Sequence, residues 1–171
     1  MHNSTNDPTH EEGLQKLRDL MKDIKFGMLV TAHEGASFRS RPMTLLQTEP
    51  NGDMWFLTGK NSSIAEDIGS DSRVNVSFTD SEKSIFVSIS GRAGLPDQPE
   101  KAKELWNPMY RTWFPKGLED PNLALLKIDV EGAEYWDSPN GTVTYLFGVL
   151  KAIATGKPPT SLGDHQKLDL K

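Results

Sequence analysis

The feature that most constrains the fold of this chain is a series of six β-rich runs joined by short turns. The pair Asn51-Gly52, between the second and third runs, is a strong signal for a β-hairpin. Helical segments do not alternate regularly with these runs, which argues against a parallel β-α-β sheet. The sequence therefore predicts a mainly β (α+β) fold, a small closed or split barrel of antiparallel strands. The six predicted strands are residues 25–33, 37–48, 53–58, 73–80, 84–95 and 124–136.

Helices are expected at the ends of this β region and at one crossing within it. The first spans residues 9–24, where Thr9 and Glu12 have the spacing of a capping box. Further helices are predicted at 63–69 and 99–113, and at 143–155 a helix is favoured over a strand. We expect residues 1–8 to be disordered and residues 157–171 to form a flexible tail. Residues 9–156 are thus predicted to make one domain.

The composition excludes several classes of protein. The net charge is −5, which argues against a nucleic-acid-binding or membrane-binding surface driven by charge. The absence of cysteine excludes disulfides, thiolate nucleophiles and cysteine-ligated metals. No apolar run reaches membrane-spanning length and no apolar signal core is present, so a cytoplasmic protein is expected.

Two arginines are predicted to share one face of the second run. Alternate side chains of a strand point the same way, so Arg39, Arg41 and Met43 lie on one face and Ser40 and Pro42 on the other. Two guanidinium groups on one face repel each other unless an anion lies between them, and guanidinium matches phosphate oxygens well. The alternative is that both arginines are solvated or pair with carboxylates.

A second anion-binding feature follows the third run. Gly59 permits a tight turn, and a helix is expected to start near Ser63, where free N–H groups and the helix dipole favour an anion. Thr58, Lys60 and Ser62 would add further donors, whereas plain capping would explain Ser63 alone. Together with the arginines, these residues predict a binding site for a doubly charged phosphate. A phosphate-bearing aromatic cofactor is therefore the first ligand to consider.

Aromatic side chains could supply the complementary apolar surface. Trp113 precedes a Pro-Gly break and Trp136 ends the last predicted strand, so both could be held at a ligand site or a dimer interface. Packing in the core is the competing explanation for each. The four histidines are scattered and no Gly-x-Ser-x-Gly motif is present, so no catalytic residue and no metal site is predicted.

Several ordered motifs together resemble a known family. They are Ser40-Arg-Pro-Met43, Trp55-Phe-Leu-Thr58 with Ser62-Ser63, Val87-Ser-Ile-Ser-Gly-Arg-Ala93, Leu105-Trp-Asn-Pro-Met109, Trp113-Phe-Pro-Lys-Gly117 and Ala133-Glu-Tyr-Trp-Asp137. Over residues 11–156 the chain resembles the general stress protein branch of the pyridoxamine 5'-phosphate oxidase-like flavin-binding split barrels. The resemblance implies a six-stranded split β-barrel with flanking helices. It also implies a homodimer with FMN, or in some members FAD, between the two subunits.

The resemblance also implies roles for individual residues. Lys60 would take the place of a basic residue that relatives carry where this chain has Ile64. Trp136 and Trp113 would reach the flavin from the other subunit. The remaining implied flavin contacts are Arg39, Ser40, Arg41, Pro42 and Met43 beside the ring and ribityl chain, Phe56, Leu57 and Thr58 on the neighbouring strand, and Ser62 and Ser63 at the phosphate.

The leading functional hypothesis is a flavin-dependent oxidoreductase with an unknown small-molecule substrate. Oxidation of vitamin B6 is not favoured, because the substrate-binding segments of the true oxidases are not recognisable. The first alternative is a non-enzymatic protein that stores or senses flavin under stress. The second is a split barrel that binds a deazaflavin, which would need a basic strip, or haem, for which His33 is the only candidate ligand away from the ends of the chain.

Overall fold

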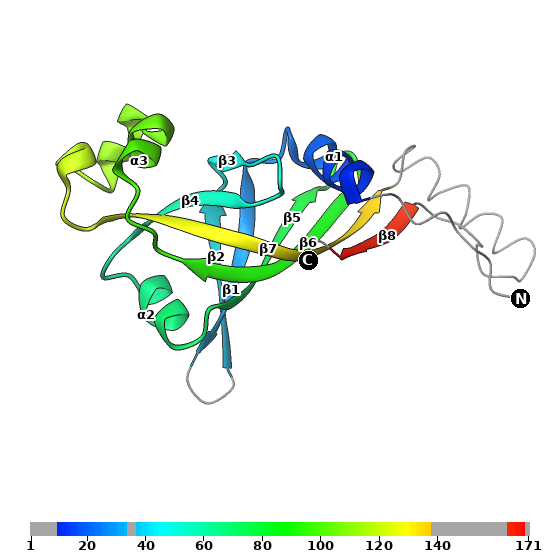
Figure 1. Cartoon of the computed structure of the whole chain (residues 1–171), viewed down its shortest axis with the longest axis horizontal. Helices are drawn as coiled ribbons and strands as arrows, with labels where there is room; N and C mark the ends of the chain where they lie inside the picture. The colour runs from blue at the N-terminus through cyan, green and yellow to red at the C-terminus, as the bar shows by residue number, and fades with distance from the viewer. Residues whose placement is uncertain (1–9, 34–36, 138–163, 170–171) are drawn as a thin grey trace, which may run out of the picture.

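The structure of the chain, a computed structural model, describes residues 10–33, 37–137 and 164–169. Within these residues eight strands form one sheet, in which every pair is antiparallel, in the order β2-β1-β5-β6-β7-β4-β3 with β8 beside β7 (Figure 1). The strands are β1 Phe26–His33, β2 Ser37–Thr44, β3 Gln47–Thr48, β4 Met54–Gly59, β5 Arg73–Asp80, β6 Ile85–Gly94, β7 Leu123–Asp137 and β8 Asp164–Asp169.

The sheet curls into a half-barrel, because β2 and β3 lie at opposite ends of the strand order but follow each other in the chain. The switch happens at two adjacent leucines. Leu45 N–H donates to the carbonyl of Lys25, before β1, and Leu46 N–H donates to the carbonyl of Trp55, in β4. The predicted run 37–48 is therefore two strands and not one. The prediction of a mainly antiparallel split barrel with flanking helices is confirmed.

The strand β8 occupies part of the segment expected to be a flexible tail. β4 pairs only with the first part of β7, up to Ile128, so the same edge of β7 is open further along. Residues 164–169 pair with that edge from Gly132 to Asp137, and Leu168 is buried in the core. The tail interpretation does not hold for these six residues. The predicted helix at 143–155 and the predicted disorder of residues 1–8 lie outside the described residues.

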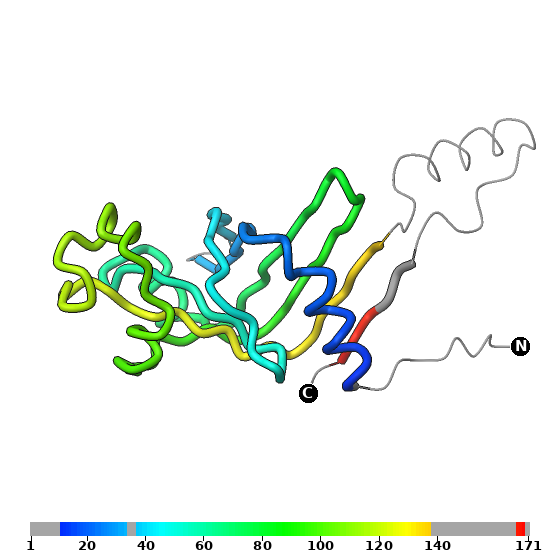
Figure 2. The backbone as a smooth tube through the Cα atoms, turned by 90° about the horizontal axis from the view of Figure 1, so that it is seen from above, coloured from blue at the N-terminus to red at the C-terminus, as the bar shows by residue number. Residues whose placement is uncertain are grey.

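The helices lie around the sheet largely where the sequence places them. They are α1 His10–Met21, α2 Ser63–Ser70 and α3 Pro99–Leu105, followed by the 3-10 turns η2 Pro108–Thr112 and η3 Gly117–Glu119. The run predicted as one helix at 99–113 breaks before Pro108, because a residue preceding proline avoids the helical conformation. Figures 1 and 2 show α1 and the α3–η3 excursion at opposite ends of the molecule. None of the described helices is long and apolar enough to cross a membrane.

The two faces of the strands have different roles. Inward residues such as Leu29, Phe78 and Ile89 are fully buried, and α1 adds Leu17 and Met21 to the same core. Alternation places other large apolar residues on the opposite, exposed surface. We call this surface the outer face; its exposed apolar residues are Phe26 and Met28 on β1, Phe38 on β2, Phe86 on β6 and Trp136 on β7.

Candidate functional site

A cleft of about 1130 Å³ opens between the end of α1, the β2–β3 connection, the end of β4 with the start of α2, and η2. Its lining includes the apolar residues Leu57, Met43 and Leu45, together with the aromatic residues Tyr110 in η2 and Trp113 directly after it. Ligand sites commonly have this character, a largely apolar pocket with a few polar groups placed to orient the ligand.

The charged groups of the cleft are all positive. Within the described residues its lining contains Arg18, Lys22 and Lys25 but no aspartate, glutamate or histidine. The whole chain carries 24 acidic residues against 19 basic ones, so this composition is the opposite of the average surface. We call the part formed by Arg18, Lys22 and Lys25 the basic end. The cleft favours an anionic ligand.

The other polar part of the cleft is the start of α2, with the residues Thr58, Gly59, Asn61, Ser62 and Asn122, here called the α2 end. Asn122 stabilises the turn before the helix through two hydrogen bonds. Its carbonyl accepts from Lys60 N–H at 2.7 Å, and its Oδ1 accepts from Asn61 N–H at 3.0 Å. Gly59 is required for this close approach, because a Cβ there would lie 2.8 Å from Asn122 Nδ2.

The residue that caps α2 is Ser62 and not Ser63. Ser62 Oγ accepts from Ala65 N–H at 3.2 Å, and it lies 3.0 Å from Thr58 Oγ1. Two hydroxyls therefore stand together at the positive end of the helix dipole, where the first amide groups of any helix lack carbonyl partners. Ser63 is exposed and does not line the cleft.

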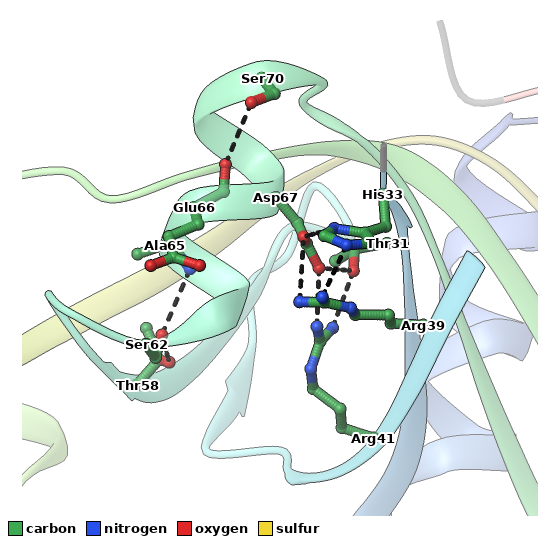
Figure 3. Close-up of polar contacts among 10 residues, drawn as sticks. All are labelled: Thr31, His33, Arg39, Arg41, Thr58, Ser62, Ala65, Glu66, Asp67 and Ser70. Carbon is green, nitrogen blue, oxygen red and sulfur yellow. Dashed lines mark hydrogen bonds and ion pairs between the residues drawn. The ribbon is translucent and has the colours of Figure 1, made fainter. Parts of the chain in front are cut away.

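Arg39 and Arg41 point the same way, as strand alternation predicts, but toward the buried carboxylate of Asp67 in α2 (Figure 3). Arg41 Nη2 donates to Asp67 Oδ2 at 2.6 Å, and Arg41 Nη1 donates to Thr31 Oγ1 at 2.7 Å. Thr31 in turn donates to Asp67 Oδ2 at 2.6 Å. Arg39 Nη1 lies 3.6 Å from Asp67 Oδ1. Both arginines therefore pair with a carboxylate, which is the alternative that the sequence left open.

His33 completes this cluster, and its contacts define its tautomer. Arg39 Nη2 lies 2.6 Å from His33 Nε2, and because a guanidinium only donates, Nε2 accepts. His33 Nδ1 must then carry the proton and donate to Asp67 Oδ1 at 2.9 Å. The imidazole is neutral in this arrangement. No haem-type ligation is indicated for His33, since both ring nitrogens are already engaged.

The pKa of Asp67 reflects two opposing effects. Burial by itself raises the pKa, because the side chain is only 1% exposed. The hydrogen bonds from Thr31, Arg41 and His33 outweigh burial and lower the pKa to about 2. Asp67 is therefore ionised at neutral pH and acts as the counter-ion of the two arginines.

The structure brings together about half of the residues predicted to contact a cofactor. Those that line the cleft are Pro42, Met43, Leu57, Thr58, Ser62 and Trp113. Arg39 and Arg41 belong to the Asp67 cluster, Phe56 is fully buried in the core, and Ser40 is exposed on β2. Lys60 is exposed beside the cleft, and Trp136 lies on the outer face near the end of β7. Their roles toward a flavin stay predictions.

Two parts of the site were not predicted from the sequence. Asp67 has a recognisable signal, because it lies between Ile64 and Ile68 on the buried side of α2, where an acidic residue needs a partner. The signal for the basic end is weaker, since Lys22 and Lys25 simply follow the end of α1 at Met21. Their common direction depends on how α1 meets β1, which only the fold determines.

Fold and cleft together define a split-barrel protein with an anion-favouring ligand site. The chain belongs to the pyridoxamine 5'-phosphate oxidase-like family, whose pattern matches residues 12–160. The protein bli-3 of Neurospora crassa is 31% identical over 159 residues, covering 85% of this chain and 76% of that protein.

Solved structures extend the comparison. The general stress FMN/FAD binding protein of Xanthomonas citri is 32% identical with a TM-score of 0.63, covering 72% of this chain and 87% of that chain. A protein from Jannaschia sp. CCS1 has the same fold with a TM-score of 0.71 at 24% identity, covering 91% of this chain and 96% of that chain. The similarity to general stress proteins predicted from the motifs is confirmed.

Proposed function

We propose that two copies of the chain hold FMN in this cleft and that the protein is a flavin-dependent oxidoreductase acting on a small molecule not yet identified. The observation that carries the proposal is a cleft open at a helix start, whose described lining residues include cations but no carboxylate, in a chain of net charge −5. The relative from Xanthomonas citri, 32% identical, is named an FMN/FAD binding protein, which supports the same ligand.

The residues at the α2 end fit the phosphate of FMN. Thr58 and Ser62 offer hydroxyls beside the helix start, and the dipole of α2 favours a dianion there. Arg41 lies outside the cleft lining, where it donates to Thr31 and Asp67, so the phosphate contacts proposed here are those of the α2 end. Pro42, Met43 and Leu57 would carry the flavin ring on their apolar surfaces.

The protein's part in the reaction is to bind and orient the flavin. When bound, FMN supplies the redox chemistry, because its ring can take up and return electrons. Within the described residues the cleft contains no carboxylate or histidine that could move a proton. The same observation favours a second candidate function, a flavin-storage protein without turnover. Reduction of the bound flavin by NADH or NADPH in a stopped-flow experiment separates the two, since a storage protein should show no sustained turnover.

The ligand itself is tested by comparing FMN with riboflavin, which lacks the phosphate. Titration of the flavin-free protein, followed by flavin fluorescence, should show FMN binding about 10- to 100-fold more tightly, as expected for one or two charge-assisted hydrogen bonds. A parallel titration with FAD tests whether the cleft accepts the longer cofactor. Equal affinity for FMN and riboflavin would contradict a phosphate-binding site at the α2 end. If neither flavin binds, the flavin assignment itself is contradicted.

A further inference from the structure

The cleft has two anion-favouring ends, and a flavin phosphate at the α2 end uses only one of them. Figures 1 and 2 show α1, which leads into the basic end, well separated from α2. The cleft volume of about 1130 Å³ is above the roughly 300–1,000 Å³ typical of a pocket for one small molecule. The cleft therefore extends over both ends rather than over the α2 end alone.

The two lysines of the basic end extend from a fixed backbone, and neither ammonium group is paired directly with a carboxylate of the described residues. The side-chain ammonium groups of Lys22 and Lys25 form no hydrogen bond or ion pair with the described residues, whereas Asp23 between them pairs with Lys83 at 2.9 Å, outside the cleft. Met21 and Ile24 are buried, and the Lys25 carbonyl accepts from Leu45 N–H at 2.8 Å, so the backbone that carries both lysines is fixed.

Apolar side chains surround this end. Met43 and Leu45 are only partly buried against the core, and Phe26 is 68% exposed at the rim. An aromatic ring exposed at the mouth of a cleft gains burial when a ligand covers it. Arg18 is engaged with the Pro50 carbonyl and with Gln15. Both partners are neutral, so Arg18 adds positive charge to this end, whereas Lys22 and Lys25 keep all their ammonium donors for a ligand.

We propose that the basic end binds the anionic head of the substrate, and that this substrate is an acid whose apolar body lies over Met43, Leu45 and Phe26. The identification of this ligand as the substrate rests on the proposed function, because it places the acid beside the flavin. The anion site itself rests only on the residues of this chain.

The test uses 2-naphthoate and its neutral analogue 2-naphthalenemethanol as probes of the FMN-saturated protein. Calorimetry should show naphthoate binding about tenfold more tightly than the alcohol, since a carboxylate gains charge-assisted contacts that an alcohol lacks. The double variant Lys22→Gln/Lys25→Gln should remove this preference and leave FMN affinity unchanged. Lys103→Gln is the matched control, because Lys103 is an exposed lysine outside the cleft.

Each outcome separates this inference from the flavin proposal. Equal binding of the two probes, or a preference that survives in the double variant, would overturn the inference and leave FMN binding intact. Loss of FMN affinity in the double variant would place the flavin phosphate at the basic end, which also overturns it. A lysine-dependent preference in protein that binds no FMN would support the anion site while removing the proposed flavin function.

Discussion

Asp67 is the residue on which the charged side of the site depends. Its carboxylate is 1% exposed and faces two guanidinium groups, a histidine and a threonine. A buried carboxylate is tolerated only with such partners, and removing one member of the set leaves uncompensated charge. Without Asp67, Arg39 and Arg41 would repel each other on the same face of β2. The cluster therefore links the position of α2 to the position of both arginines.

Replacing Asp67 should destabilise the fold markedly. We expect Asp67→Asn to lower the free energy of unfolding by about 3 kcal/mol, because it leaves the buried Arg41 contact without its anion. Urea unfolding at neutral pH measures this. The matched control is Asp71→Asn, which breaks an aspartate–arginine pair that is exposed to solvent, where little change is expected. Equal effects of the two substitutions would show that burial of the Asp67 cluster does not increase its contribution to the free energy of unfolding.

The Asp67 cluster should also make the free energy of unfolding depend on pH in the acidic range. The pKa of Asp67 is about 2 in the folded chain, below the value of about 3.9 for an unfolded aspartate. Its contribution is therefore fully present above about pH 4 and is lost as the pH falls toward about 2. The Asp67→Asn variant should show a flatter dependence of unfolding free energy on pH in that window.

Salt distinguishes this effect from that of an exposed pair. Arg73 lowers the pKa of Asp71 to about 2 as well, chiefly through a side-chain hydrogen bond. That pair is open to solvent, so high salt should screen it, whereas the buried cluster should be screened much less. At high ionic strength only Asp67→Asn should still flatten the pH profile. A flattening by both variants, or by neither, would count against the buried cluster as the cause.

At the scale of elements, the pairing of β6 with β7 contains a β-bulge, where the register shifts between Ser90 and Gly91. A Cβ at Gly91 would lie 2.3 Å from the carbonyl oxygen of Asp129 in β7, a contact that only a backbone shift could relieve. Glu131 of β7 is the extra residue, because Ser90 pairs with Gly132 and Gly91 pairs with Val130. Glycine is thus required at this position by close approach of two strands.

Gly91→Ala should therefore destabilise the protein, by about 2 kcal/mol or more, the range of overpacked sites. Gly94→Ala in the same strand is the matched control, because a Cβ there meets nothing within 4 Å. That variant should be neutral or slightly stabilising, since alanine restricts the unfolded chain. Thermal unfolding of the two variants gives the comparison. A smaller loss for Gly91→Ala than for Gly94→Ala would contradict the bulge geometry.

The elements also show what local sequence can predict here. Turn residues and alternation predicted β1, β4, β5, β6 and β7 closely, because each signal is contained within a few neighbouring residues. The division of 37–48 at Leu45 and the pairing of β8 were not predicted, since both depend on which distant strand offers an open edge. The same limit explains the site: Arg39 and Arg41 were predicted to share a face, but their partner Asp67 comes from another element.

At the scale of the whole molecule, the outer face is an apolar surface that one copy of the chain leaves in water. Phe38 is 75% exposed and Met28 43% exposed, and the cross-strand pairs Ala32–Phe38 and Met28–Pro42 place them on one surface of β1 and β2. Contiguous exposed apolar residues of this size mark interaction surfaces. Pro42 and Phe26 belong both to this side and to the cleft, so a second copy docked here would also border the ligand.

The proposed homodimer should therefore weaken when this surface is made polar. Burying a phenylalanine or methionine side chain contributes about 1.5–3 kcal/mol, so Met28→Ser/Phe38→Ser should raise the dimer dissociation constant by about 100-fold or more. Sedimentation at several concentrations measures this. Leu118→Ser in η3 is the control, an exposed apolar residue away from the outer face. If the flavin lies between two subunits, FMN affinity should fall together with dimerisation. A monomeric variant that keeps full FMN affinity would place the flavin within one chain, and an undisturbed dimer would move the interface elsewhere.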